Sequence, residues 1–105
     1  MDSPIWVVKP ASAQARKAWE KAKKQEPDLI AKEKERLENR PLERGENPTR
    51  AHQLRGALAT RAVGGVKLDQ WQHELTSDGR IWYCVDRKKR IIWVIKVSLS
   101  HPNET

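Results

Sequence analysis

Three runs rich in aromatic and β-branched residues occupy the C-terminal third of the chain, residues 71–101, and two short polar turns separate them. Such residues favour strands, and turns of this length join neighbouring antiparallel strands. The first turn contains Ser77-Asp78-Gly79, a three-residue loop in which the glycine is expected at positive φ. The second is the charged segment 86–89. This third of the chain therefore predicts an antiparallel meander.

The two faces of the meander differ in chemistry, because successive side chains along a strand point to opposite faces. With Thr76 opposite Arg80, the apolar face carries Trp71, Leu75, Ile81, Tyr83 and Val85. The mixed face carries Gln72, Glu74, Thr76, Arg80, Trp82 and Cys84. In the last run, the residues expected to point inward are Ile91, Trp93, Ile95, Val97 and Leu99, and those expected on the other face are Ile92, Val94, Lys96 and Ser98. A slip of one residue would bury two charged side chains, so the alternation specifies the register strongly.

The N-terminal part predicts one strand and two helices. Residues 5–9 form a short apolar run that ends at Pro10, and we expect it to be a strand within the sheet. Residues 11–38 are rich in helix formers and predict a helical hairpin. Pro27 begins its second helix, since proline is well tolerated in a first turn. Trp19 lies on the apolar stripe and is expected to anchor the first helix.

A loop and the sheet complete the expected order. Residues 40–53 lack periodicity and predict a loop. Residues 54–100 predict four antiparallel strands, with Gly64-Gly65 as a two-residue hairpin turn. In the first of these strands the residues expected to face the core are Leu54, Leu58 and Ala62. The predicted fold is therefore α+β, with the helices on one face of the sheet and the other face open.

Composition limits the classes of function. A chain of 105 residues is expected to form one domain, residues 1–105. A single cysteine, Cys84, excludes an internal disulfide and is expected to be a small buried hydrophobe. No signal peptide, membrane span, clustered zinc ligands or glycine-rich phosphate loop is visible, so we expect a cytoplasmic protein without metal or cofactor. The net charge is +7, and residues 40–105 hold twelve basic against seven acidic residues. A basic sheet indicates a polyanionic partner, although basic residues also serve solubility alone.

The open face carries the candidate chemistry. Arg80 is suited to hold a phosphate bidentately, and the simpler alternative is a cross-strand salt bridge with Glu74. Cleaving RNA through its 2′-hydroxyl needs a base, an acid and cations on the phosphate, but no metal. Glu74 and His101 are candidates for the proton transfers, and His52 borders the same face. Trp82 is placed to stack a base or to be covered by a loop or partner. The expected RNA-positioning cations are Arg55, Arg61 and Lys96.

In order and spacing, the chain resembles the RelE/ParE toxin superfamily, and in particular the RelE and YoeB-like messenger-RNA interferases. The resemblance covers residues 5–101 and rests on the short strand, the two helices and the basic loop, followed by two motifs. The motifs are Leu54-Arg55-Gly56-x-Leu58 and Gly79-Arg80-Ile81-x-Tyr83-x-Val85, which precede a terminal apolar strand.

The resemblance implies a metal-independent endoribonuclease toxin of a type II toxin–antitoxin system, which binds the ribosome, cuts messenger RNA and is inhibited by an antitoxin. By position, the family's strand-opening arginine falls on Arg80, its second-strand basic residue on Arg55 and its late histidine or tyrosine on His101. The position near the YoeB-like glutamate base is occupied by His52, which leaves Glu74 as the other candidate base. Two alternatives are a ParE-like inhibitor of DNA gyrase and a noncatalytic RNA-binding or partner-binding module of the same fold.

Overall fold

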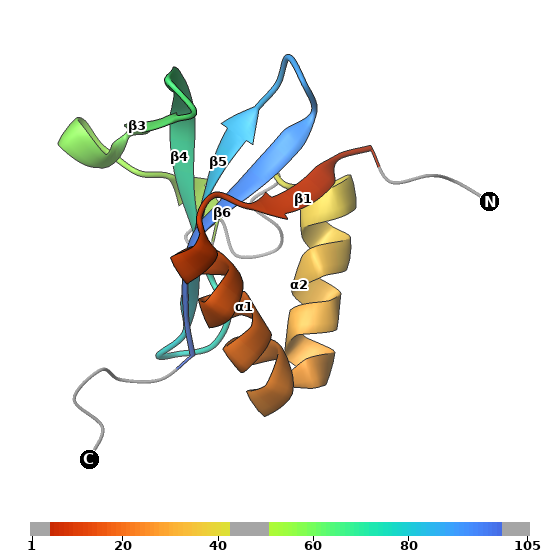
Figure 1. Ribbon diagram of the computed structural model, residues 1–105. Coiled ribbons are helices and arrows are strands. Elements are labelled where there is room, and N and C mark those ends of the chain that lie inside the picture. The colour runs from red at the N-terminus through yellow and green to blue at the C-terminus, as the bar shows by residue number, and fades with distance from the viewer. Residues whose placement is uncertain (1–4, 43–50, 100–105) are drawn as a thin grey trace.

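The computed structural model describes residues 5–42 and 51–99. Two helices and a mixed sheet confirm the α+β class, and the helices lie side by side on one side of the sheet (Figure 1). No helix within the described residues is long and apolar enough to cross a bilayer. The elements in chain order are β1 (Val7–Pro10), α1 (Ala13–Gln25), α2 (Pro27–Asn39), β2 (Ala51–Gln53), the 3₁₀ turn η1 (Gly56–Leu58), β3 (Thr60–Val63), β4 (Val66–Glu74), β5 (Arg80–Asp86) and β6 (Ile91–Ser98).

The sheet contains both parallel and antiparallel pairs of strands. The strand order is β1-β6-β5-β4-β2, and β3 also pairs with β4. β1 runs parallel to β6, and the other pairs are antiparallel. A parallel pair needs a long crossover, and the helical hairpin begins it. The strand expected within the sheet at residues 5–9 is present with shifted bounds, Val7–Pro10, and the expected four strands after the helices are corrected to the five strands β2–β6.

Local sequence signals set the helix ends. The side chain of Ser12 accepts a hydrogen bond of 3.0 Å from the backbone N–H of Ala15, which caps α1. Pro27 stands at the start of α2, as expected. Trp19 packs against the core cluster together with its neighbour Ala18. The predicted hairpin and its apolar stripe are therefore confirmed.

The predicted strand over residues 54–63 is wrong in its first half. Gly56 has φ of +63°, a conformation that other residues rarely adopt, and the chain leaves the sheet there in η1. The backbone of Gln70 in β4 accepts a hydrogen bond from Leu54 N–H and donates one to Ala59 O. Both Leu54 and Ala59 are therefore bonded to the same residue, and residues 55–58 loop out of the sheet between them. Leu58 is consequently 47% exposed and not in the core. The loop expected over 40–53 also ends in β2, and its residues 43–50 lie outside the described part.

The β4–β5 hairpin has the predicted faces with a shifted register. Glu74 lies opposite Arg80, whereas Thr76 was expected there. Because the shift is two residues, every side chain keeps its predicted face. The expected positive φ of Gly79 is also corrected, since the glycines with positive φ in the described residues are 56, 64 and 65. A Cβ at Gly79 would lie 3.2 Å from the backbone of Leu99, so close approach is what requires glycine at this position.

A β-bulge reverses the predicted faces of the first half of β6. The pairing with β5 shifts between Trp82 and Tyr83, so that Ile95 is the extra residue. Before the bulge, Ile92 and Val94 are buried and Trp93 points to the other face, opposite Cys84. After the bulge the prediction is right, because Val97 and Leu99 pack in the core and Lys96 and Ser98 face away from it.

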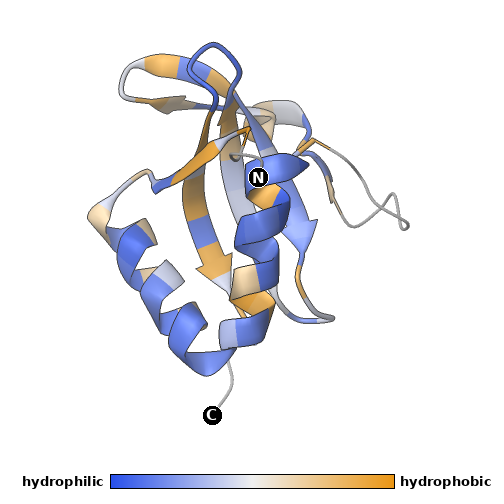
Figure 2. Ribbon diagram, turned by 90° about the vertical axis from the view of Figure 1, so that its right-hand side faces the viewer, coloured by the Kyte–Doolittle hydropathy of each residue, from blue (hydrophilic) through white to orange (hydrophobic). Residues whose placement is uncertain are grey.

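The core lies between the helices and one face of the sheet. Trp71 and Tyr83 stack with their ring centroids 6.4 Å apart, and Leu75, Ile81 and Val85 join them, as predicted. From the helices, Ala22, Ile30 and Leu37 contribute buried side chains to this cluster. Figure 2 shows the hydrophobic residues concentrated on the strands, while the helices are largely hydrophilic. We call the sheet face away from the helices the open face, and the η1 turn covers one part of it, where Gln70 Nε2 donates to Leu58 O at 2.8 Å and both Gln70 and Cys84 are buried.

Candidate functional site on the open face

The cross-strand register gathers candidate residues from four strands in one row of the open face. His52 of β2 lies opposite Gln72, Gln72 lies opposite Trp82, and Trp82 lies opposite Lys96. The indole N–H of Trp82 donates to Gln72 Oε1 at 2.7 Å. Lys96 Nζ lies 5.1 Å from the centroid of the Trp82 ring, a cation–π distance. The row therefore combines an imidazole, an aromatic surface and a cation.

The next row carries a carboxylate and a guanidinium. Glu74 lies opposite Arg80, and Arg80 lies opposite Ser98. Residues directly opposite in an antiparallel pair have Cβ atoms about 4.5–5.5 Å apart, and this row is two residues, or roughly 7 Å, from the Trp82 row. Arg80 is exposed and Glu74 is partly exposed. Within the described residues no ion pair joins them, so their charges are not neutralised by the salt bridge considered above.

The remaining predicted residues are more scattered. Arg61 of β3 is exposed and lies opposite Leu68, towards the other end of the same face. Arg55 is exposed in the turn before η1 and is not part of a strand. His101 lies outside the described residues. The structure thus brings together His52, Glu74, Arg80, Trp82 and Lys96, and it separates Arg55 and Arg61 from them.

Cys84 lies between these rows and the basic end of the sheet. Its side chain is fully buried, as predicted for a small hydrophobe. Burial raises the pKa of the thiol to about 11, an effect that nearby Arg61 opposes and Asp69 reinforces. A thiol in this state is a poor nucleophile, so Cys84 is structural.

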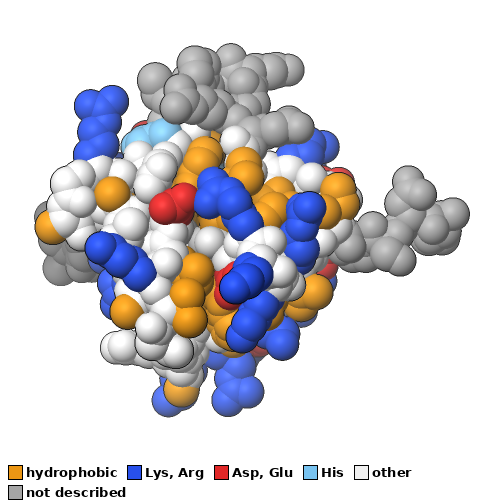
Figure 3. Space-filling view, turned by 90° about the horizontal axis from the view of Figure 1, so that it is seen from above, with side chains coloured by type: hydrophobic (Ala, Val, Ile, Leu, Met, Phe, Trp, Pro, Cys, Tyr) orange, Lys and Arg blue, Asp and Glu red, His pale blue; other side chains and the backbone are white. Residues whose placement is uncertain are grey.

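Basic side chains gather at the end of the sheet formed by the β3–β4 and β5–β6 turns (Figure 3). A hollow of about 410 Å³ there is lined by residues of both turns, including Lys67, Lys88 and Lys89. Arg87 Nη1 lies 2.7 Å from Asp69 Oδ2, and the Arg90 guanidinium lies 5.0 Å from the centroid of the Trp6 ring. This end of the sheet is therefore a second cationic surface, and it accounts for part of the positive charge noted in the sequence.

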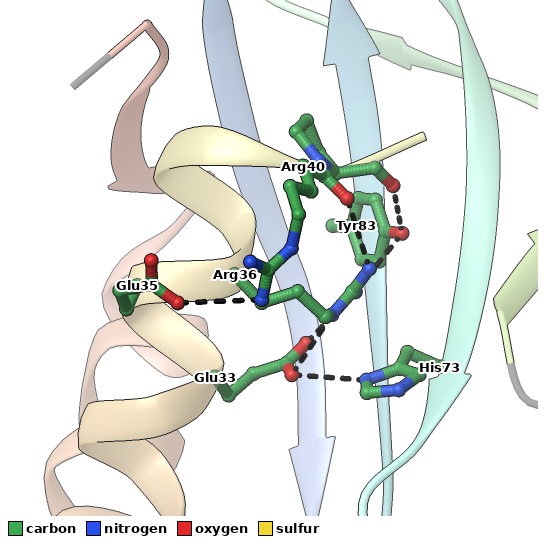
Figure 4. Close-up of polar contacts among 7 residues, drawn as sticks. Glu33, Glu35, Arg36, Arg40, His73 and Tyr83 are labelled. Atoms are coloured by element: carbon green, nitrogen blue, oxygen red, sulfur yellow. Dashed lines mark hydrogen bonds and ion pairs between the residues drawn. The ribbon is translucent and has the colours of Figure 1, made fainter. Parts of the chain in front are cut away.

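A buried ionic network braces the sheet from the helix side (Figure 4). The Glu33 carboxylate of α2 pairs with Arg36, with Nε–Oε1 and Nη2–Oε2 distances of 3.1 and 3.0 Å. His73 Nδ1 lies 2.9 Å from Glu33 Oε1, near enough for an ion pair when the ring is protonated, although the geometry is not that of a hydrogen bond. Arg36 also donates to the Tyr83 hydroxyl, and Tyr83 donates to Pro41 O at 2.6 Å. The sequence offered no signal for this network, because Arg36 and Pro41 lie 47 and 42 residues from Tyr83 in the chain and meet it only through the fold.

Two members of the network have shifted pKa values. Burial alone would lower the pKa of Arg36, but the hydrogen bond to Glu33 and the neighbouring charges outweigh it and raise that pKa. Burial raises the pKa of Tyr83 to about 12, although the Arg36 charge opposes this. Because His73 lies between Gln72 and Glu74 in β4, the network holds the strand that carries these two residues of the open face.

Comparisons with protein-family models, with curated proteins and with solved structures found no match to this chain. Within residues 5–42 and 51–99, no three His, Cys, Asp or Glu side chains gather in a group suited to a metal ion.

Proposed function

We propose that the chain is an endoribonuclease toxin of a type II toxin–antitoxin system, which acts on messenger RNA at the ribosome in the cytoplasm. The observation that carries the proposal is the placement of Glu74 beside Arg80 on the open face, next to the row that holds His52, Trp82 and Lys96. These are the groups that cleavage through a 2′-hydroxyl uses: a proton acceptor, a guanidinium and further cations.

In the proposed reaction the 2′-oxygen of the RNA attacks the adjacent phosphorus, and the bond from phosphorus to the 5′-oxygen breaks. Glu74 or His52 takes the proton from the 2′-hydroxyl, and Arg80 stabilises the negative charge that develops on the phosphate. His101 is proposed to supply the proton to the leaving 5′-oxygen. The products are a 2′,3′-cyclic phosphate and a free 5′-hydroxyl. Lys96 and Arg61 contribute to holding the RNA backbone, and Arg55 contributes from the adjoining turn.

The partner proposed for inhibition is a cognate antitoxin with an acidic segment. The exposed cations of the open face and the basic end of the sheet support this, because an acidic segment competes with RNA for the same charges. No small-molecule cofactor takes part in the proposed reaction.

Induced expression tests the proposal. The wild-type chain is expected to arrest growth, with new 5′ ends in a cellular transcript detected by primer extension. Arg80→Ala is expected to slow cleavage about 100-fold, the usual effect of losing one donor to a developing oxyanion. Arg16→Ala is the matched control, since Arg16 is an exposed arginine on α1. Full toxicity of an Arg80→Ala, His101→Ala double variant at equal expression would contradict the assignment.

The same experiment separates the two alternatives. DNA breaks with intact messenger RNA would indicate a gyrase inhibitor. Tight RNA binding without cleavage, even on ribosomes, would indicate a noncatalytic module.

A further inference from the structure

The bulge in β6 turns a second tryptophan onto the open face. Trp93 lies opposite Cys84 in β5 and opposite Lys9 in β1. Cys84 is two residues from Trp82 along β5, so the two tryptophans are diagonal neighbours on adjacent strands. Diagonal neighbours on one face are about 7–8 Å apart, within reach of each other's large side chains. Both tryptophans are partly exposed.

This arrangement is unusual for a core-forming strand. The run from Ile91 to Leu99 offers many apolar side chains for the helix side, and Ile92, Val94 and Val97 occupy that side. Trp93 is therefore not needed in the core, and its large ring is instead displayed beside Trp82. Bulges are over-represented next to functional sites because they re-aim a side chain in this way.

The charges around the two rings favour an anionic ligand. Lys96 lies over the Trp82 ring, and Lys9 is exposed at the position paired with Trp93. Arg61 and Arg80 lie at the two ends of the same face. Within the described strands, the acidic residues of this face are Glu74 and Asp86, and Asp86 is buried with its carboxylate accepting from Lys89 N–H.

We infer that Trp82 and Trp93 form a platform on which two bases of single-stranded RNA stack, with Lys96 and Lys9 contacting the phosphates beside them. Aromatic side chains on neighbouring strands of an exposed sheet stack two or three bases in other sheet-based RNA-binding domains. Between them, Cys84 lies opposite Trp93 and two residues from Trp82, and it is fully buried. Duplex RNA is excluded because its bases are already stacked on each other. The inference rests on the proposed function for its ligand class, and it adds which nucleotides are held and by what.

Binding is measured with a hexanucleotide that carries 2′-O-methyl groups, so that cleavage cannot contribute. Trp93→Leu is expected to weaken binding about 10-fold, the usual effect of losing one base–aromatic stack. Trp93→Phe keeps an aromatic face and is expected to bind within about threefold of the wild-type chain. Trp19→Phe, which changes a tryptophan in the helix layer, is the matched control and is expected to bind unchanged.

An abasic nucleotide provides a second readout that does not depend on how well Trp93→Leu folds. Placed in turn at each position of the hexanucleotide, it is expected to weaken wild-type binding about 10-fold at two adjacent positions. At one of these positions, Trp93→Leu and the abasic change are expected to be nonadditive, because each removes the same stack.

Four results would overturn the inference. These are unchanged RNA affinity in Trp93→Leu, additive effects at every abasic position, equal binding of duplex RNA, and absence of wild-type binding to the hexanucleotide. If Trp93→Leu instead weakened capture of an acidic protein partner and left RNA binding intact, the two tryptophans would be assigned to a protein interface. The growth-arrest experiment with Arg80→Ala decides the proposed function separately.

Discussion

Removal of the Glu33 carboxylate should destabilise the protein far more than removal of a comparable exposed ion pair. The Glu33 side chain is 3% exposed and its partner Arg36 is 13% exposed. Glu33→Ala would leave the Arg36 guanidinium largely buried without its carboxylate, and would also remove the neighbour of His73. Breaking a buried pair in this way costs about 3–5 kcal/mol, much of it the penalty of an uncompensated buried charge. That is a large part of the 5–15 kcal/mol by which native domains of this kind are stable.

The same helix supplies the control. Lys34 pairs with Glu38 at 2.8 Å, but the Lys34 side chain is 54% exposed. Lys34→Ala should therefore cost less than about 1 kcal/mol. Glu33→Gln keeps the shape and one acceptor for Arg36, so its cost should lie between those of the other two variants. The assay is urea unfolding at pH 7, followed by tryptophan fluorescence, which gives the free energy of unfolding of each variant.

Two outcomes would refute the reasoning. If Glu33→Ala and Lys34→Ala lowered the free energy of unfolding equally, the network would not brace the sheet. If Glu33→Ala were more stable than the wild type, the desolvation of the charges would outweigh their attraction, as it does in some buried pairs.

Three further predictions concern single residues. In the folded protein the pKa of Tyr83, the only tyrosine, is raised to about 12 from about 10, so its contribution to the free energy of unfolding is fully present below about pH 10 and is lost as the pH rises to about 12. Tyrosinate absorbance during an alkaline titration checks this, and ionisation near pH 10 in the folded protein would contradict it. Cys84, the only cysteine, should react with iodoacetamide only as fast as the protein unfolds, and rapid alkylation of the native protein would show that the thiol is accessible. Gly79→Ala should lower the free energy of unfolding by about 1–3 kcal/mol, because its Cβ would lie 2.8 Å from Thr76 Oγ1 and 3.2 Å from Leu99 Cα. Gly64→Ala is the control, since its Cβ meets no atom within 4 Å and the variant reports only the backbone strain at φ of +58°.

Much of the fold was predictable because its signals are local. Pro27 and the apolar stripe around Trp19 indicate the two helices, and Gly64-Gly65 indicates a tight turn. The alternation in β4 and β5 predicts which side chains face the helices, and it survives a two-residue error in register. For the same reason Glu74, Arg80 and Trp82 were correctly assigned to one face.

The same reasoning failed for the nearly all-apolar strand β6. A run in which nearly every side chain suits the core carries no alternation, so the sequence does not specify which residues face inward. The bulge at Ile95 is settled by pairing with β5, and it moved Trp93 from the predicted core to the open face. In residues 54–63, Gly56 is a local signal for the interruption of the expected strand. The hydrogen bond from Gln70 N–H to Ala59 O, which brings the chain back to the sheet, depends on β4 and has no local signal.

By itself the amino-acid sequence determined the helices, the turns and the chemistry of alternating strands, since each depends on residues within a few positions of one another. Only the tertiary structure decided that β1 lies parallel to β6, that Glu33 reaches His73, and that His52 joins the row of Trp82. Those contacts join segments far apart in the chain. They form only when the helices cover one face of the sheet and the strands select their partners, and no local pattern encodes that selection.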